Sequence, residues 1–289
     1  MRRRRPGCAR RWSSAASDVY NGPGIDTVDI AQIIILSLVQ GFTEFLPVSS
    51  SAHLILIPII TGWTDQGMSF DLAAHLGTLI AVSIFFRDDL KKLIYAAPGI
   101  RKRDASFPDY KNLLHMFLIA TIPVMIVGFF GQDFVRTELR DAHIIATSTV
   151  FFAVVLWVAD IYGKREREIF NLNSRDALLI GLAQAGALVP GVSRSGITIS
   201  LALMLGFSRE AASRFSFLLA IPVILAAVSL EFITIVTSAR EMHWGFLCLT
   251  TAVSAAGAYL CIAIFLSLIE KIGMLPFVIY RLLLGAALF

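Results

Sequence analysis

Two short polar segments interrupt long apolar stretches of the chain, and they carry the residue types that phosphate chemistry uses. The first is PVSSSAH at residues 47–53, and the second is PGVSRSG at residues 190–196. The guanidinium of Arg194 is a permanently charged planar fork that matches the geometry of phosphate oxygens. A serine or histidine nucleophile beside such an anion clamp is what phosphoryl transfer requires. The two segments therefore indicate a phosphate site assembled from distant parts of the chain.

Hydroxyl residues surround the arginine in the second segment and precede the histidine in the first. A helix that begins at such a segment offers free N–H groups and a positive dipole end, which together make a ready phosphate site. The hydroxyls can bind an anion there, or they can cap the helix. The candidates for phosphate binding or attack are Ser49, Ser50, Ser51 and His53 in the first segment, and Ser193, Arg194, Ser195 and Thr198 in the second.

A carboxylate precedes the first polar segment. Glu44 can bind a hard divalent cation through oxygen, or it can act as a general base. Gln40 lies four residues earlier and therefore on the same face of a helix. Its side chain can add a neutral carbonyl ligand or a hydrogen bond to whatever Glu44 holds.

Each of these candidates has a structural alternative. The serines of the two segments can be helix caps, and His53 can be a histidine at the membrane interface. Arg194 and Glu44 can form a structural ion pair between the two segments. Other polar residues in apolar stretches have less specific signals. We expect Asp71, His75 and Glu231 to line the cavity or to be structural, and Arg281 to hold the last helix to its neighbours.

The elements that must position these residues are membrane helices. Of the 289 residues, 56% are hydrophobic and only 16% are charged, and the mean hydropathy is +0.74. Soluble domains carry about a quarter charged residues, so this composition excludes a water-soluble protein. The net charge of +4 does not indicate nucleic-acid binding, because the basic residues lie in short loops between apolar runs. The three cysteines have no paired spacing, which argues against zinc, iron–sulfur and disulfide sites.

Six apolar stretches are long enough to cross about 30 Å of hydrocarbon as helices, although the last is short. Two further apolar regions are broken by the polar segments, and neither half of either region can cross alone. Backbone at membrane depth must be buried in protein or line a wet cavity. We therefore interpret both regions as re-entrant helical hairpins whose polar tips meet inside the protein. The six stretches are 70–86, 112–131, 142–161, 211–235, 244–269 and 275–289.

The two broken regions also resemble each other. Residues 48–52 align with residues 192–196 at an offset of 144. Three full spans lie between them, and an odd number places the second hairpin on the opposite membrane face. We therefore predict an all-α polytopic membrane protein with six transmembrane helices and two re-entrant hairpins in an inverted repeat. Its halves are about 29–161 and 176–289.

The loop charges predict the orientation. Fourteen Lys and Arg residues lie on one side of the predicted topology and three on the other, so the first side is cytoplasmic. The first 28 residues would then place six arginines on the wrong side. We expect residues 1–28 to be a disordered extension or an upstream misreading of the start, and residues 29–289 to be a single integral-membrane domain.

A family resemblance rests on both polar segments. QGFTEFLPVSSSAH (40–53) and PGVSRSGIT (190–198) resemble the signature motifs of the bacterial undecaprenyl-diphosphate phosphatases, the bacitracin-resistance phosphatases. FDLAAHLGTLIAV (70–82), FSFLLAIP (215–222) and PFVIYRLLLG (276–285) also match this family. The resemblance implies removal of one phosphate from undecaprenyl diphosphate, which recycles the carrier lipid of peptidoglycan synthesis. It also implies the same fold in the bacterial plasma membrane, with an active site open to the outer side.

The resemblance further implies roles for individual residues. Gln40 and Glu44 fill the (E/Q)xxxE positions that are tied to activity and to a divalent cation, for which we expect Mg²⁺ or Ca²⁺. Ser50 and His53 fill the catalytic positions of the first motif, and Arg194 is the phosphate-binding arginine. The motif leaves open whether serine or histidine attacks phosphorus; we favour Ser50 assisted by His53. The expected partners are a polyprenyl diphosphate and membrane lipids, without nucleic acid, and a homodimer remains open.

The chain departs from the family pattern at two positions. Gln40 stands where Glu is also found, which can weaken metal binding, and Ala52 stands where Gly is common.

Three alternative functions are weighed against the phosphatase. An inverted-repeat transporter or flippase for a lipid phosphate or another anion is the main alternative. Type-2 phosphatidic acid phosphatases fail on spacing, because the position six after Arg194 is Ser200 rather than histidine. A purely structural membrane protein would leave the buried charges unexplained.

Overall fold

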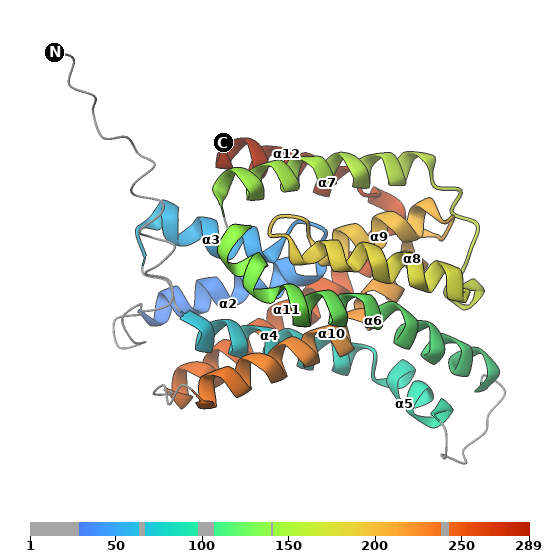
Figure 1. Cartoon of the computed structure of the whole chain (residues 1–289), viewed down its shortest axis with the longest axis horizontal. Coiled ribbons are helices and arrows are strands. Elements are labelled where there is room, and N and C mark those ends of the chain that lie inside the picture. Colours follow the sequence, from blue (N-terminus) through green and yellow to red (C-terminus); the bar gives the residue numbers. More distant parts are fainter. Residues whose placement is uncertain (1–28, 64–66, 98–106, 140, 238–242) are drawn as a thin grey trace.

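The computed structural model describes residues 29–63, 67–97, 107–139, 141–237 and 243–289. Within these ranges the chain forms eleven α-helices and two short 3₁₀ helices, and its only β-pairing is an isolated bridge between Arg167 and Phe207. The all-α prediction is therefore confirmed for the described residues (Figure 1). The expectation for residues 1–28 lies outside them.

Five of the helices are long and apolar enough to cross a membrane. A sixth, α12 (Leu275–Leu288), has only 14 residues, as the short last stretch of the sequence led us to expect. Helices therefore occupy all six predicted stretches. The five long helices are α4 (Gly67–Phe85), α6 (Phe107–Glu138), α7 (Ala142–Tyr162), α10 (Arg209–Thr237) and α11 (Trp244–Ile272).

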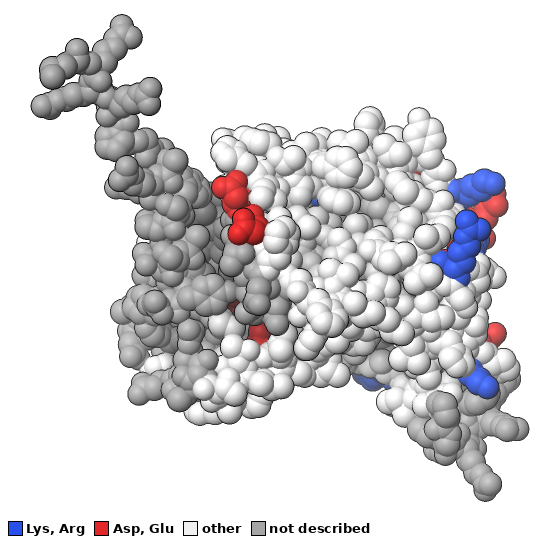
Figure 2. Space-filling model, viewed as in Figure 1, with Lys and Arg blue, Asp and Glu red and all other residues white. Residues whose placement is uncertain are grey.

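The face of the molecule drawn in Figure 2 is mostly apolar, and its charged side chains lie toward the two ends. Figure 2 shows a broad face without Lys, Arg, Asp or Glu, and Lys and Arg at one end. That end includes the amphipathic helix α5 (Arg87–Ala96) and the short helix η2 (Ile169–Asn171). Ion pairs tie it together, with N–O distances of 2.6 Å for Arg209–Asp160 and 3.3 Å for Arg214–Asp89. An apolar face with charged ends suits a protein that lies across a bilayer.

The two interrupted regions form two pairs of short helices. The first pair is α2 (Ile30–Phe45) and α3 (Ser50–Thr61), and the second is α8 (Ser174–Ala185) and α9 (Arg194–Met204), with the 3₁₀ turn η3 (Gly186–Leu188) before the break. In Figure 1 the pairs lie at opposite ends of the long axis and their turns meet near the middle. A hydrogen bond joins the turns directly, from Ser195 Oγ to the carbonyl oxygen of Leu46 at 2.8 Å.

The two turns share an unusual backbone geometry. Ser49 has φ of 72° and Ser193 has φ of 68°, and each residue immediately precedes the second helix of its pair. The two serines also contact the hydroxyl two residues later at the same Oγ–Oγ distance, 3.2 Å to Ser51 and 3.2 Å to Ser195. A positive φ is costly for serine and persists where the surroundings enforce it. The sequence offset of 144 therefore corresponds to a repeated local structure.

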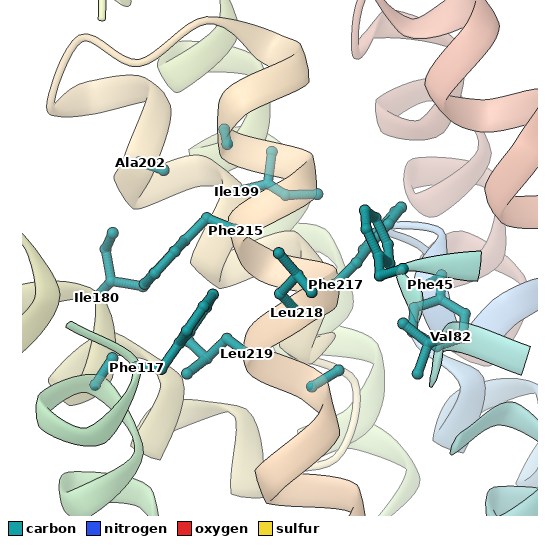
Figure 3. Close-up of a cluster of buried hydrophobic side chains, with 14 of the residues drawn as sticks. Phe45, Val82, Phe117, Ile180, Ile199, Ala202, Phe215, Phe217, Leu218 and Leu219 are labelled. Carbon is teal, nitrogen blue, oxygen red and sulfur yellow. The ribbon is translucent and has the colours of Figure 1, made fainter. Parts of the chain in front are cut away.

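The core positions the first turn through α10. In Figure 3, α10 sends Phe215 and Leu219 toward Phe117 and Ile180 on one side, and Phe217 toward the other side. There Phe217 packs edge-to-face against Phe45, the last residue of α2, with ring centroids 5.2 Å apart. Both rings are fully buried. This contact fixes the end of α2, and with it the carboxylate one residue earlier.

Candidate active site

The carboxylate of Glu44 is the centre of the polar cluster between the two turns. Its Oε2 accepts hydrogen bonds from Gln40 Nε2 and Ser50 Oγ, both at 2.9 Å. Its Oε1 accepts a hydrogen bond at 3.1 Å from Nη2 of Arg194, the first residue of α9. The side chains of Glu44 and Arg194 are 8% and 13% exposed, so this ion pair is largely buried. The structure therefore brings together the carboxylate, a candidate nucleophile and the arginine.

Two hydrogen bonds hold the side chain of Arg194, and they occupy only part of its N–H donors. Besides Glu44, its Nη1 donates to the carbonyl oxygen of Ser216 on α10 at 3.3 Å. A guanidinium has five N–H donors, so these two bonds leave donors for an anion. The guanidinium carbon also lies 5.9 Å from the ring centre of Phe45. The ion pair between the hairpins, which the sequence offered as a structural alternative, is present and joins the candidate catalytic groups.

The remaining hydroxyls of the second turn stabilise its backbone. Ser193 Oγ accepts from the N–H of Gly196 at 3.1 Å and so caps α9. Thr198 Oγ1 donates to the carbonyl oxygen of Arg194 at 2.8 Å and contacts Ser216 Oγ at 2.7 Å. These are cap and packing contacts, as the structural alternative expects. Phosphate binding by Ser49, Ser51, Ser193, Ser195 and Thr198 stays a prediction.

Each ring nitrogen of His53 has a hydrogen-bond partner other than Ser50, so the expected assistance of Ser50 by His53 stays a prediction. Its Nδ1 lies 2.7 Å from the carbonyl oxygen of Ser49, and its Nε2 lies 2.5 Å from the hydroxyl of Tyr280 on α12. The two rings are parallel within 3°, with centroids 5.5 Å apart. The sequence analysis missed Tyr280, although a hydroxyl in the apolar stretch 276–285 was a signal.

His75, which we expected to line the cavity or to be structural, lies near Glu44. Its Nε2 lies 4.0 Å from Glu44 Oε2, and its Nδ1 lies 2.8 Å from the carbonyl oxygen of Asp71 one turn earlier. A carbonyl can only accept, so Nδ1 carries a hydrogen and Nε2 faces the carboxylate. His75 therefore belongs to the surroundings of Glu44.

Arg281 is fully buried and binds backbone carbonyls. It donates to Gly191 at 2.9 Å, Val192 at 3.0 Å, Thr149 at 3.3 Å and Pro47 at 3.4 Å. These bonds connect α12 to α7 and to both turns. The expectation that this arginine holds the last helix to its neighbours is confirmed.

Comparisons with known proteins identify the family of this chain. The family model for the bacitracin resistance protein BacA matches residues 33–287, which include every residue of the site. The chain belongs to the BacA family. It is 50% identical over 261 residues to the undecaprenyl-diphosphatase of Alcanivorax borkumensis, covering 90% of this chain and 98% of that protein. It is 48% identical over 262 residues to the undecaprenyl-diphosphatase of Thioalkalivibrio sulfidiphilus, again covering 90% and 98%.

The donor set of this BacA family member suits a cation that is shared with a substrate. Gln40 is fully buried, and its Oε1 has no hydrogen-bond partner in the described part of the chain, so it is an available oxygen ligand. Glu44 supplies carboxylate oxygens beside it. The described residues contain no group of three His, Cys, Asp or Glu side chains that could hold a metal. Mg²⁺ is typically bound by one or two carboxylates together with substrate phosphates, which fits two protein ligands.

Proposed function

We propose that this BacA family member hydrolyses undecaprenyl diphosphate to undecaprenyl phosphate and inorganic phosphate. This reaction recycles the carrier lipid for peptidoglycan synthesis and confers resistance to bacitracin. The observation that carries the proposal is the contact set of Glu44, which binds the hydroxyl of Ser50 and the guanidinium of Arg194 at once. A nucleophile, a base and an anion clamp then meet between two half-helix N-termini, as phosphoryl transfer needs. The relatives named undecaprenyl-diphosphatase support the same substrate.

The proposal includes a membrane topology. Five long helices and α12 cross the bilayer, while α2–α3 and α8–α9 are re-entrant hairpins that enter from opposite faces as an inverted repeat. The shared φ values of Ser49 and Ser193 and the opposed hairpins of Figure 1 support this arrangement. The end that carries α5 and the described loop lysines and arginines is cytoplasmic. The protein lies in the bacterial inner membrane, and the site opens to the outer side.

In the mechanism, the terminal phosphate of the diphosphate binds between the two turns. Arg194 donates to its oxygens, and Ser50 passes its proton to Glu44 as Ser50 Oγ bonds to the terminal phosphorus. The bond from that phosphorus to the bridging oxygen breaks, and undecaprenyl phosphate leaves with the electron pair. Water then attacks the phosphorus of the phosphoserine, and the bond from phosphorus to Ser50 Oγ breaks. Glu44 returns its proton to Ser50 Oγ, and inorganic phosphate leaves with the protons of the water.

A divalent cation, Mg²⁺ or Ca²⁺, fits this site as a partner of the diphosphate. Gln40 Oε1 and the Glu44 carboxylate would hold it, and it would supply neutralisation of phosphate charge. The chain's own groups remain responsible for orientation, because Gln40 also holds Glu44 through its Nε2. A homodimer stays a prediction.

The test is phosphate release from undecaprenyl and farnesyl diphosphate by the detergent-purified protein, first with Mg²⁺ and then with EDTA. We expect metal-dependent release that is lost in Arg194→Ala. A matched control is Arg175→Ala, which removes an exposed arginine at the charged end of the molecule. Release that survives Arg194→Ala would contradict the site. Absence of release with any metal would favour the transporter or flippase alternative, which moves its substrate without cleaving it.

A further inference from the structure

The orientation of His53 bears on how the first turn is held. The carbonyl oxygen of Ser49 can only accept a hydrogen bond, so Nδ1 of His53, at 2.7 Å, carries the hydrogen. In the neutral ring Nε2 is then an acceptor, and the hydroxyl of Tyr280 donates to it at 2.5 Å. Tyr280 therefore selects one tautomer of His53 by occupying the other nitrogen. Neither nitrogen is left for Ser50, whose hydroxyl donates to Glu44.

The backbone at Ser49 in the first turn depends on a hydrogen bond from outside the turn more than the backbone at Ser193 in the second turn does. Both turns contain a serine with positive φ, but only the second serine, Ser193, caps its helix with its own side chain. Ser49 makes no cap hydrogen bond, and its carbonyl oxygen is instead held by His53. The strained peptide between Ser49 and Ser50 is therefore fixed by a chain that runs from Tyr280 through His53. This peptide leads directly to the candidate nucleophile.

The same segment of α12 also holds the other side of this turn. Arg281, the residue after Tyr280, donates to the carbonyl oxygen of Pro47 at 3.4 Å. Adjacent residues of α12 thus hold the first turn before and after the left-handed residue Ser49. The parallel stack of the Tyr280 and His53 rings keeps the phenol in line with Nε2.

We propose that Tyr280 is a positioning residue that acts through His53. Its hydroxyl fixes the Nδ1–H tautomer and the ring orientation of His53, which holds the Ser49 carbonyl and so aims Ser50 Oγ at the terminal phosphorus. This inference rests on the proposed assignment of Ser50 as the nucleophile. Tyr280 itself needs no contact with the substrate.

The test variant is Tyr280→Phe, which keeps the stacked ring and removes only the hydroxyl. The matched control is Tyr259→Phe, because Tyr259 has the same exposed fraction of 44% and lies on α11 against Phe85. We expect kcat to fall about 5- to 30-fold, the rate equivalent of one lost hydrogen bond, with KM within about twofold. In a His53→Gln background, Tyr280→Phe should produce no further loss, because its effect passes through His53.

A second readout does not depend on turnover. In protein with ¹⁵N-labelled histidine, the His53 signals, assigned by their loss in His53→Gln, should report a single Nδ1–H tautomer. In Tyr280→Phe they should move toward a mixture of tautomers, while Tyr259→Phe leaves them unchanged. Unchanged His53 signals, or kcat within twofold of wild type, would overturn the positioning role. Tautomer selection by Tyr280 in a protein that releases no phosphate would retain the contact and reject the proposed function instead.

Discussion

Glu44→Gln tests two roles of Glu44 separately: its action as a base in catalysis and its neutralisation of the buried charge of Arg194. The amide has nearly the shape of the carboxylate and can still accept from Arg194, but it cannot take a proton from Ser50. Loss of general-base catalysis typically costs about 10²- to 10⁴-fold. We therefore expect phosphate release to fall by at least about 100-fold while the protein remains inserted in the membrane. Glu44→Ala and Arg194→Ala should both abolish turnover.

The same substitution leaves a buried charge uncompensated. Arg194 is 13% exposed, and with a neutral amide at position 44 its guanidinium keeps hydrogen bonds but loses the charge that neutralises it. Removing one partner of a buried ion pair costs on the order of 3–5 kcal/mol, less here because the guanidinium is not fully enclosed. The double variant Glu44→Gln/Arg194→Gln removes both charges. It should recover most of the lost stability and none of the activity.

Two measurements on the purified protein check this reasoning. Phosphate release from undecaprenyl diphosphate reports the chemistry, and thermal unfolding in detergent reports stability. Glu210→Gln is the matched control, since Glu210 is 55% exposed and pairs with Arg214 at 3.7 Å at the charged end. The reasoning is refuted if Glu44→Gln retains release within tenfold of wild type, or if the double variant is less stable than Glu44→Gln.

Three further predictions concern the surroundings of this carboxylate. Chelation by EDTA should abolish phosphate release, and added Mg²⁺ should restore it. Gln40→Glu should lower the Mg²⁺ concentration that gives the half-maximal rate. An unchanged Mg²⁺ titration in this variant would contradict Gln40 as a ligand. Gly41→Ala should lower the unfolding temperature, because its Cβ would lie 2.6 Å from a backbone oxygen of α11, whereas Gly245→Ala, which meets nothing within 4 Å, should not. His75→Gln should reduce kcat less than about fivefold, since His75 Nε2 lies 4.0 Å from Glu44 Oε2, beyond hydrogen-bond distance. A loss above about 100-fold would make His75 a catalytic residue.

The sequence was sufficient for what depends on local hydropathy. The six apolar stretches, the two breaks and the polar residues at the breaks each follow from a window of about 20 residues, because a bilayer imposes a length and excludes unsatisfied backbone. Arg194 and Glu44 could be linked in advance because each is a buried charge that needs a partner. Their pairing across 150 residues is what the structure contains.

Local hydropathy could not predict which side chains contact each other when they lie far apart in the sequence. Tyr280 and His53 are 227 residues apart, and neither residue type at its position demands the other. His75 lies four residues from Asp71 on a helix that reads as an ordinary span, and only the packing of α4 and α2 places it beside Glu44. Hydropathy gives the depth of a residue in the membrane, whereas its neighbours depend on how the helices rotate and cross.

Arg281 and Arg194 are both buried near the site, but their hydrogen-bond partners indicate different roles. Among the described residues, Arg281 donates only to backbone carbonyl oxygens. Its side chain is fully enclosed, so no space beside it is left for an anion. Arg194 pairs with the carboxylate of Glu44, which neutralises the positive charge that would otherwise attract a diphosphate. A diphosphate that binds the remaining donors of Arg194 would lie close to Glu44, so two like charges would meet in the same site. We therefore expect a divalent cation held by Glu44 and Gln40 to relieve this repulsion, which would explain a loss of phosphate release in EDTA.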